Sequence, residues 1–195
     1  MPLTPSSAPR ARLHTRDIEV SGYRRDDGLY DIEGHLTDIK SRDLTLTAGI
    51  RKAGEPVHEM WLRITIDKRL NIVDAEAQTD AGPYPGNCER ITPDYKQLVG
   101  LSLLPGFTTK VREMFRGAHG CTHITELIGS VATVAYQTLA GEVTQPEHMK
   151  PFQLDKCHAL MSDGPVVAQH YARWYTGRHE DDPAIAETAN PQGSR

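Results

Sequence analysis

Strict alternation of apolar and polar residues over positions 57–66 is the feature that most constrains how this chain can fold. The apolar positions of the alternation are Met60, Leu62, Ile64 and Ile66. A period of two residues predicts a β-strand with one buried face. Asp67-Lys68-Arg69 is a turn, and residues 70–79 return as an antiparallel partner, so the pair is predicted to form a hairpin.

The other predicted strands precede this hairpin and the predicted helices follow it. Residues 29–40 and 44–50 alternate in the same way, whereas residues 94–99, 108–115 and 123–139 are typical of helices, the last with the clearest helical period. Strands that come first and helices that come second predict an α+β fold: an antiparallel β-meander sheet followed by helices packed on one face.

The two ends of the chain differ in composition from its middle. Residues 1–16 are rich in Pro, Ser and Arg and are interpreted as a flexible N-terminal arm, and residues 178–195 as a flexible C-terminal tail. A single α+β domain is therefore expected over residues 17–177. Within it, residues 166–175 could form a short helix or a strand.

Charge and hydropathy exclude several classes of partner. The net charge of −4 is spread over interspersed acidic and basic residues, so we expect neither nucleic acid nor a membrane as a partner. No apolar run approaches the roughly 20 residues of a membrane span. An odd set of three cysteines and a start without a secretory signal favour a reducing cytoplasm. A small-molecule substrate is expected, and a homo-oligomer stays open.

Cys121 is the residue that most suggests chemistry. It opens the predicted helix 123–139, where unpaired backbone N–H groups and the helix dipole favour a thiolate. If Gly120 lets Cys121 occupy the entry turn, Cys121 and His123 can share an ion, and His58 and Cys88 supply the separated ligands of a zinc or iron site. No Cys-x-x-Cys or His-Glu-x-x-His motif accompanies them.

Several roles around this site stay open at the level of sequence. The expected catalytic residues are Cys121, His123 and Tyr84, the last because it stands between two prolines in the loop that leads to Cys88. His119 and Cys157 are further candidate ligands. The same cysteine could instead be a nucleophile with a histidine as its base, or simply a buried thiol.

A second polar group lies in the predicted strand 29–40. Asp31, Glu33, His35 and Asp38 are assigned to its polar face, where they could form an acid/base cluster or ligate a hard metal. A solvated strand face gives the same pattern without any function.

Two resemblances add to these expectations. The segments DGLYDIEGHLTD, HEMWLRITID, DAEAQTDAGPYPGNC, LPGF and GCTHITELI resemble a bacterial family known only as a domain of unknown function, DUF twenty-eight eighty-nine, over roughly residues 16–177. Membership of that family implies no settled activity.

The order of elements also resembles, remotely, the iron–sulfur cluster scaffold proteins of the IscU/NifU type. Those proteins place helices after an antiparallel sheet and bind zinc or a cluster through cysteines at one end. Cys88 and Cys121 resemble the second and third scaffold cysteines, and His58 falls in a region that bears ligands in that family, whereas the first scaffold cysteine has no counterpart near Pro56. The resemblance implies a metal held by His58, Cys88 and Cys121, with His123 or His119 as a further ligand.

Together these observations predict a small cytoplasmic metalloprotein with zinc or iron bound. The leading hypothesis is an enzyme with hydrolase- or lyase-type chemistry on a small organic substrate. The alternatives are a non-catalytic carrier of a metal or iron–sulfur cluster, and a cysteine–histidine nucleophile enzyme without metal.

Overall fold

A computed structural model describes residues 3–142 and 148–177 of the chain. The chain divides into two compact units, Met1–Val143 and Thr144–Arg195. Where a single domain was expected over residues 17–177, the contacts thus separate a larger first unit from a smaller second one.

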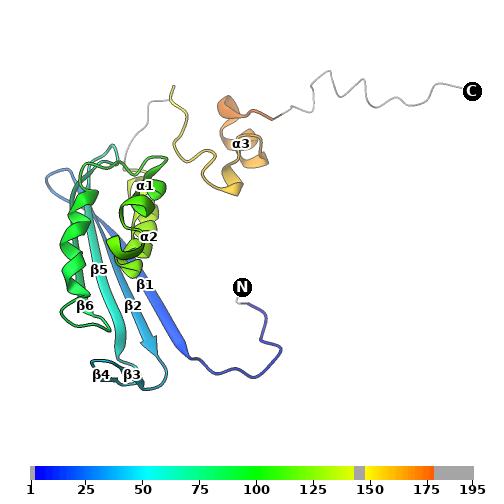
Figure 1. Cartoon of the computed structure of the whole chain (residues 1–195). Coiled ribbons are helices and arrows are strands. Elements are labelled where there is room, and N and C mark those ends of the chain that lie inside the picture. Colours follow the sequence, from blue (N-terminus) through cyan, green and yellow to red (C-terminus); the bar gives the residue numbers. More distant parts are fainter. Residues whose placement is uncertain (1–2, 143–147, 178–195) are drawn as a thin grey trace, which may run out of the picture. The chain divides into compact units, whose positions relative to one another are not determined.

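The first unit is built on a four-stranded antiparallel sheet (Figure 1). Its strands are β1 (His14–Arg24), β2 (Tyr30–Lys40), β5 (Pro56–Ile66) and β6 (Ile72–Ala81), in the order β1-β2-β5-β6. Strands β3 (Leu44–Leu46) and β4 (Gly49–Arg51) form a separate two-stranded sheet. The predicted α+β class and antiparallel sheet are confirmed.

Strand β1 was not predicted, and its first three residues fall in the expected N-terminal arm. It is an edge strand and has few apolar positions to signal it, chiefly Ile18 and Val20. Its pairing with β2 fixes it along its whole length, from His14 opposite Lys40 to Arg24 opposite Tyr30. The strand predicted over residues 44–50 is split in two because Gly49 takes a left-handed φ of 127° in the turn.

The helices follow the sheet in the predicted order. They are the 3₁₀ helix η1 (Glu89–Leu98), α1 (Phe107–Met114), the short 3₁₀ helix η2 (Gly117–His119) and α2 (Thr122–Leu139). Helix α2 packs against β1, β2 and β5. Gly22 and Gly34 permit its close approach, since a Cβ atom would lie 1.9 Å from Thr138 Oγ1 at Gly22 and 2.7 Å from Val131 Cγ2 at Gly34.

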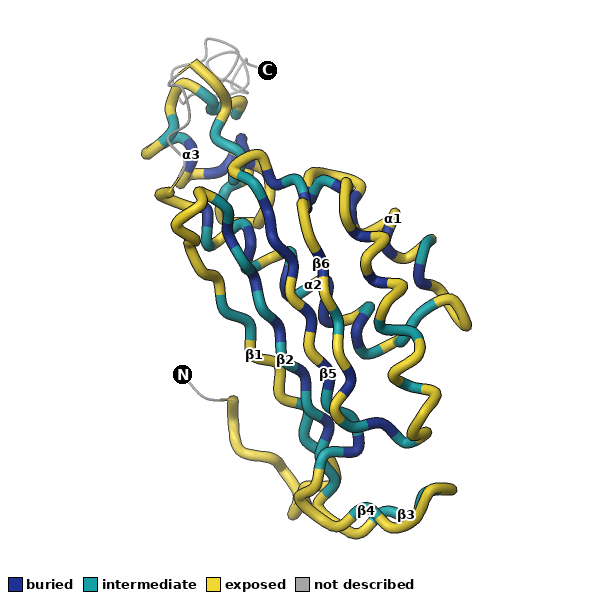
Figure 2. The backbone as a smooth tube through the Cα atoms, turned by 90° about the vertical axis from the view of Figure 1, so that its left-hand side faces the viewer, coloured by how far each residue is buried: buried dark blue, intermediate teal, exposed yellow. Residues whose placement is uncertain are grey.

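The sheet has one buried face and one solvent-facing face. In β2, alternate residues from Tyr30 to Asp38 are buried, and those between them are partly exposed (Figure 2). The buried face and the inner side of α2 share one apolar core, which includes Ile32, Leu36, Leu127 and Val131. The outcome is a two-layer unit in which helices cover only one side of the sheet.

The second unit contains the helices η3 (His158–Leu160), α3 (Pro165–His170) and η4 (Ala172–Trp174). The alternative of a helix in residues 166–175 is therefore the correct one. Asp155 organises this unit by accepting hydrogen bonds from Lys150 Nζ at 2.7 Å and from the Ser162 backbone N–H at 2.8 Å. The expected tail, residues 178–195, lies outside the described residues.

Among the described residues, none of the helices has the length and apolar character that a bilayer crossing requires.

Candidate functional site

Three neighbouring strands bring polar side chains together at one end of the buried face of the sheet. Arg16 of β1 lies opposite Asp38 of β2, and Asp38 lies opposite His58 of β5. Directly opposed residues of antiparallel strands point to the same face. The register therefore places a cation, a carboxylate and an imidazole in one row, beneath the start of α2.

Helix α2 adds His123 to this row from its first turn. The buried hydroxyl of Tyr95 fixes the start of the helix: it accepts a hydrogen bond from the Cys121 backbone N–H at 2.8 Å and lies 2.9 Å from the Cys121 carbonyl oxygen. The residue before Cys121 is Gly120. A larger residue would not fit there, because a Cβ atom would lie 2.6 Å from the backbone oxygen of Phe115. The sequence Gly120-Cys121 thus sets the position from which His123 enters the site.

Both imidazoles converge on one carboxylate oxygen. Nδ1 of His58 lies 3.2 Å and Nε2 of His123 lies 3.4 Å from Oδ2 of Asp38. The two rings are stacked, with centroids 3.8 Å apart. One potential ligand atom from each residue lies within 4.8 Å of the other two. Two ligands bound to one ion at about 2.1 Å are themselves roughly 3.0–3.4 Å apart, so the separations fit a shared ion.

A shell of charged groups holds the Asp38 carboxylate in place. Arg16 binds it with two hydrogen bonds, Nε to Oδ1 at 2.8 Å and Nη2 to Oδ2 at 2.7 Å. His14 Nε2 lies 3.0 Å from Oδ1. Arg16 also pairs with Glu126 of α2. Carboxylates that ligate metals are commonly hydrogen-bonded in this way by a second layer of residues.

The environment favours the protonation states that metal binding needs. Burial, with a smaller contribution from the charge of His123, lowers the pKa of His58 to about 4. Burial also lowers the pKa of His123. Burial opposes ionisation of Asp38, but the hydrogen bonds and charge of Arg16 outweigh it and hold the pKa of that carboxyl below its usual value. Near pH 7 the site therefore offers neutral imidazoles and a carboxylate.

The structure brings some of the predicted site residues together and leaves others apart. It brings His58 and His123 together, with ring centroids 3.8 Å apart, and their role as ligands stays a prediction. Cys121 Sγ lies 3.8 Å from Nδ1 of His123. Within the described residues, the cluster of three potential ligands contains Asp38, His58 and His123 and no cysteine.

The remaining candidates are not part of this cluster of described residues. Cys88 precedes η1 and packs on Gly82, where a Cβ atom would lie 2.8 Å from its sulfur. Tyr84 is exposed in the loop before it, and His119 is exposed at the end of η2. Cys157 is exposed in the second unit. Their assignment to the site stays a prediction.

The polar group assigned to one face of β2 is divided between its two faces. Asp31, Glu33 and His35 point away from the helices, and His35 stacks on Trp61 with centroids 3.7 Å apart. Asp38 lies on the opposite, buried face because it differs from them in parity and shares the parity of Ile32 and Leu36. Its placement on the polar face was wrong. A carboxylate at a buried-face position is the sequence signal that would have separated Asp38 from the other three residues.

No curated protein and no solved structure matches this chain. The resemblance to the IscU/NifU scaffold proteins stays a prediction.

The family comparison covers the first unit and contains the whole cluster. The match extends over residues 14–137, from the first residue of β1 almost to the end of α2. Asp38, His58, His123 and the surrounding Arg16 and Glu126 all lie within it. On this match, the chain belongs to the family described as "Protein of unknown function (DUF2889)".

Proposed function

We propose that this protein binds a zinc or iron(II) ion through Asp38, His58 and His123 and uses it for hydrolase- or lyase-type chemistry on a small organic substrate. The supporting observation is the convergence of both imidazoles on Oδ2 of Asp38, at 3.2 and 3.4 Å. Two histidines and a carboxylate are a ligand set that zinc hydrolases and non-haem iron enzymes share.

The ligand set leaves room for catalysis. Three protein ligands leave at least one coordination position for water or substrate, and a bound ion in such a site polarises a carbonyl or activates water. Asp38 has only 3% of its side chain exposed, whereas His58 and His123 have 20% and 22%. The buried carboxylate anchors the site, and the two imidazoles form its solvent-facing side.

The surrounding residues have positioning roles in this proposal. Arg16 orients Asp38 through both carboxylate oxygens. Cys121 lies against Nδ1 of His123, the ring nitrogen away from Asp38, and so restrains the orientation of that ring. In the reducing cytoplasm expected from the sequence, this thiol would stay reduced.

Metal analysis of variants tests the proposal. Protein purified without added metal, then titrated with Zn²⁺ or Co²⁺, should bind about one ion per chain, and His58→Ala, His123→Ala and Asp38→Asn should weaken binding by at least about tenfold. His35→Ala is the matched control, because His35 occupies the opposite face of the same sheet. Wild-type protein that binds no stoichiometric ion, or His58→Ala that binds like wild type, would exclude the site.

The proposed ligand set contains no thiol. Cys88→Ala and Cys121→Ala should keep the bound ion if the three ligands are sufficient. Brown, sulfide-containing protein after anaerobic reconstitution with iron and sulfide, with colour lost in both cysteine variants, would instead assign the function of a cluster carrier.

A second candidate function rests on Cys121 itself. Its sulfur lies 3.8 Å from Nδ1 of His123, and Nε2 of the same ring lies 3.4 Å from Asp38 Oδ2. A thiol at the start of an 18-residue helix, followed by an imidazole and a carboxylate, is the order of groups that a cysteine nucleophile uses.

Alkylation kinetics separate this candidate from the metal site. In metal-free protein, Cys121 should react with iodoacetamide faster than glutathione does at pH 7, and His123→Ala should abolish the difference while His35→Ala keeps it. Mass spectrometry identifies the alkylated cysteine. A Cys121 that reacts no faster than glutathione would remove the nucleophile hypothesis and leave the metal proposal intact.

A further inference from the structure

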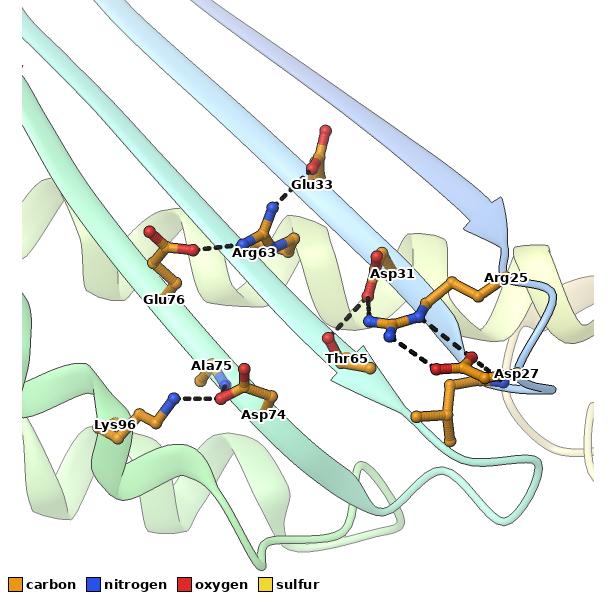
Figure 3. A network of polar contacts seen from close by, with 11 residues as sticks. Arg25, Asp27, Asp31, Glu33, Arg63, Thr65, Asp74, Ala75, Glu76 and Lys96 are labelled. Carbon is orange, nitrogen blue, oxygen red and sulfur yellow. Dashed lines mark hydrogen bonds and ion pairs between the residues drawn. The ribbon is translucent and has the colours of Figure 1, made fainter.

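The face of the sheet that points away from the helices carries a repeated pair of carboxylates. In Figure 3 the helices pass behind the strands, and acidic side chains project from the near side. The motif Asp-x-Glu occurs as residues 17–19 in β1, 31–33 in β2 and 74–76 in β6. Because residues i and i+2 of a strand share a face, each pair presents two carboxylates about 7 Å apart.

Most of these carboxylates are neutralised by nearby cations. Arg63 pairs with Glu33 and Glu76, Arg25 pairs with Asp31, and Lys96 pairs with Asp74 (Figure 3). The exception is the pair on β1. Asp17 and Glu19 are exposed and have no ionic partner within the described residues.

The pair on β1 is also next to an open sheet edge. Strand β1 has β2 on one side and no strand on the other within the described part of the chain. Eleven residues of exposed edge invite a further chain, because their outward N–H and C=O groups lack a ladder partner.

The segment that precedes β1 has the complementary charge. Residues 3–13 are exposed throughout and contain Arg10 and Arg12 but no acidic residue. In an extended segment, the Arg-x-Arg spacing places two guanidinium groups on one side about 7 Å apart, which matches an Asp-x-Glu pair. Arginine and carboxylate form the strongest of such pairs, because their hydrogen bonds can be bidentate.

The arm of the same chain cannot make this contact. His14 to Asp17 are held in the ladder from Lys40 to Thr37, and the Leu13 carbonyl accepts a hydrogen bond from the Ser41 N–H at 3.3 Å. Only Leu13 separates Arg12 from the strand. That length does not let the chain reverse and lay both arginines over Asp17 and Glu19. The arm of a second copy has no such restriction.

We infer that two copies of this chain associate at the β1 edge, with Arg10 and Arg12 of each copy binding Asp17 and Glu19 of the other. Such an exchange is symmetric, so it closes into a dimer. It neutralises the unpaired carboxylates and covers the open edge in both copies. The inference is independent of the metal site, which lies on the other face of the sheet.

Sedimentation velocity of the full chain tests this inference. A dimer is expected at about 0.02 M salt and a shift toward monomer at about 0.5 M, since salt screens exposed charge pairs. Arg10→Glu with Arg12→Glu should weaken self-association by about tenfold or more. Lys110→Glu with Arg112→Glu is the matched control, because these exposed cations have the same spacing on α1.

Charge reversal on both sides gives the decisive comparison. Asp17→Arg with Glu19→Arg should also produce monomers, and the four-fold variant that reverses arm and strand together should recover the dimer. Wild-type protein that is monomeric at low salt overturns the inference. So does a dimer that the arm variant leaves unchanged, or a four-fold variant that stays monomeric. The arm variant changes no residue of the folded sheet, so its result does not depend on the stability of the other variants.

Discussion

Asp38 carries the charge on which the proposed site depends, although only 2% of its surface is exposed to solvent. An unpaired buried carboxylate is costly, and this one is stabilised by the two hydrogen bonds from Arg16 and by His14. Oδ2, which accepts a hydrogen bond from Nη2 of Arg16, also faces the two imidazoles. The carboxylate is therefore both a structural partner and the centre of the proposed ligand set.

Asp38→Asn should lower the free energy of unfolding of the metal-free protein by about 1–3 kcal/mol, because Arg16 loses the more buried of its two carboxylate partners and one of its acceptors. Urea denaturation followed by circular dichroism measures this change. Glu33→Gln, on the exposed face of the same strand, should stay within about 0.5 kcal/mol of wild type. Equal effects of the two substitutions would contradict the role assigned to Asp38.

The sequence predicted two of the three proposed ligands, His58 and His123, because their residue types and positions at element boundaries point to metal chemistry. Asp38 was recognised as a polar residue but placed on the wrong face, although its parity with Leu36 was readable. Arg16 could not be predicted as a partner, because only the register of β1 on β2 brings it opposite Asp38. Pairing between strands is a tertiary property.

The start of α2 is fixed by a single hydroxyl group. Tyr95, fully buried in η1 and stacked on Phe115 with centroids 4.4 Å apart, holds the backbone of Cys121. The position of His123, two residues later, depends on this contact. The packing of η1 is thereby linked to the geometry of the site.

Tyr95→Phe should lower stability by about 1–2 kcal/mol, since the Cys121 N–H loses its partner. Metal affinity should fall as well, although the hydrogen bonds of Tyr95 go to Cys121 and Thr125 and not to the proposed ligands. Isothermal titration with Zn²⁺ measures affinity, and Tyr136→Phe, on α2, is the comparison. Unchanged affinity in Tyr95→Phe would show that the start of the helix is held by other contacts.

Two glycines should respond in opposite ways to the same substitution. Gly34→Ala should destabilise the fold by about 1–3 kcal/mol, because the new methyl group meets Val131 Cγ2 at 2.7 Å. Gly129→Ala, exposed on α2 with no atom within 4 Å of the new Cβ, should stabilise it by up to about 1 kcal/mol. Thermal denaturation of both variants checks the pair, and a stabilising Gly34→Ala would refute the close contact.

The elements with strong periodicity were predicted well. Strands β2 and β5 and helix α2 each bury one face, so their apolar residues recur at a fixed spacing. Strand β1 has one neighbouring strand and a partly exposed inner side, and its sequence lacks that regularity. Gly22 allows the close approach of α2 because it has no side chain. For the same reason it adds no apolar side chain to the pattern of β1.

All residues of the proposed centre belong to the first unit, Met1–Val143. A fragment of residues 1–143 should therefore fold and bind Zn²⁺ with the affinity of the full chain, within about threefold. Circular dichroism and isothermal titration of the fragment check this expectation. A folded fragment that has lost its affinity would show that the second unit contributes to the site.

The second unit should lose its order in acid. Hydrogen bonds from Lys150 and then Ser162 hold the pKa of Asp155 below its ordinary value of 3.8. A carboxyl with a lowered pKa stabilises the folded state above its ordinary pKa, and this stabilisation is lost as the pH falls below that value. Hydrogen-exchange protection factors of residues 148–177 should therefore fall below about pH 4, and Asp155→Asn should show the same loss of protection at pH 7. Unaltered exchange in Asp155→Asn would contradict this role.

The edge strand β1 supplies Arg16, which binds Asp38, and an edge strand is the part of a sheet that detaches most easily. While β1 is in place, Arg16 keeps the carboxylate oriented toward the two imidazoles. Transient detachment of β1 would remove this support and loosen the ion, so a contact that holds this strand in place should also help to retain the ion. Ion exchange at the centre would then be governed by the fraying of the sheet rather than by access through solvent.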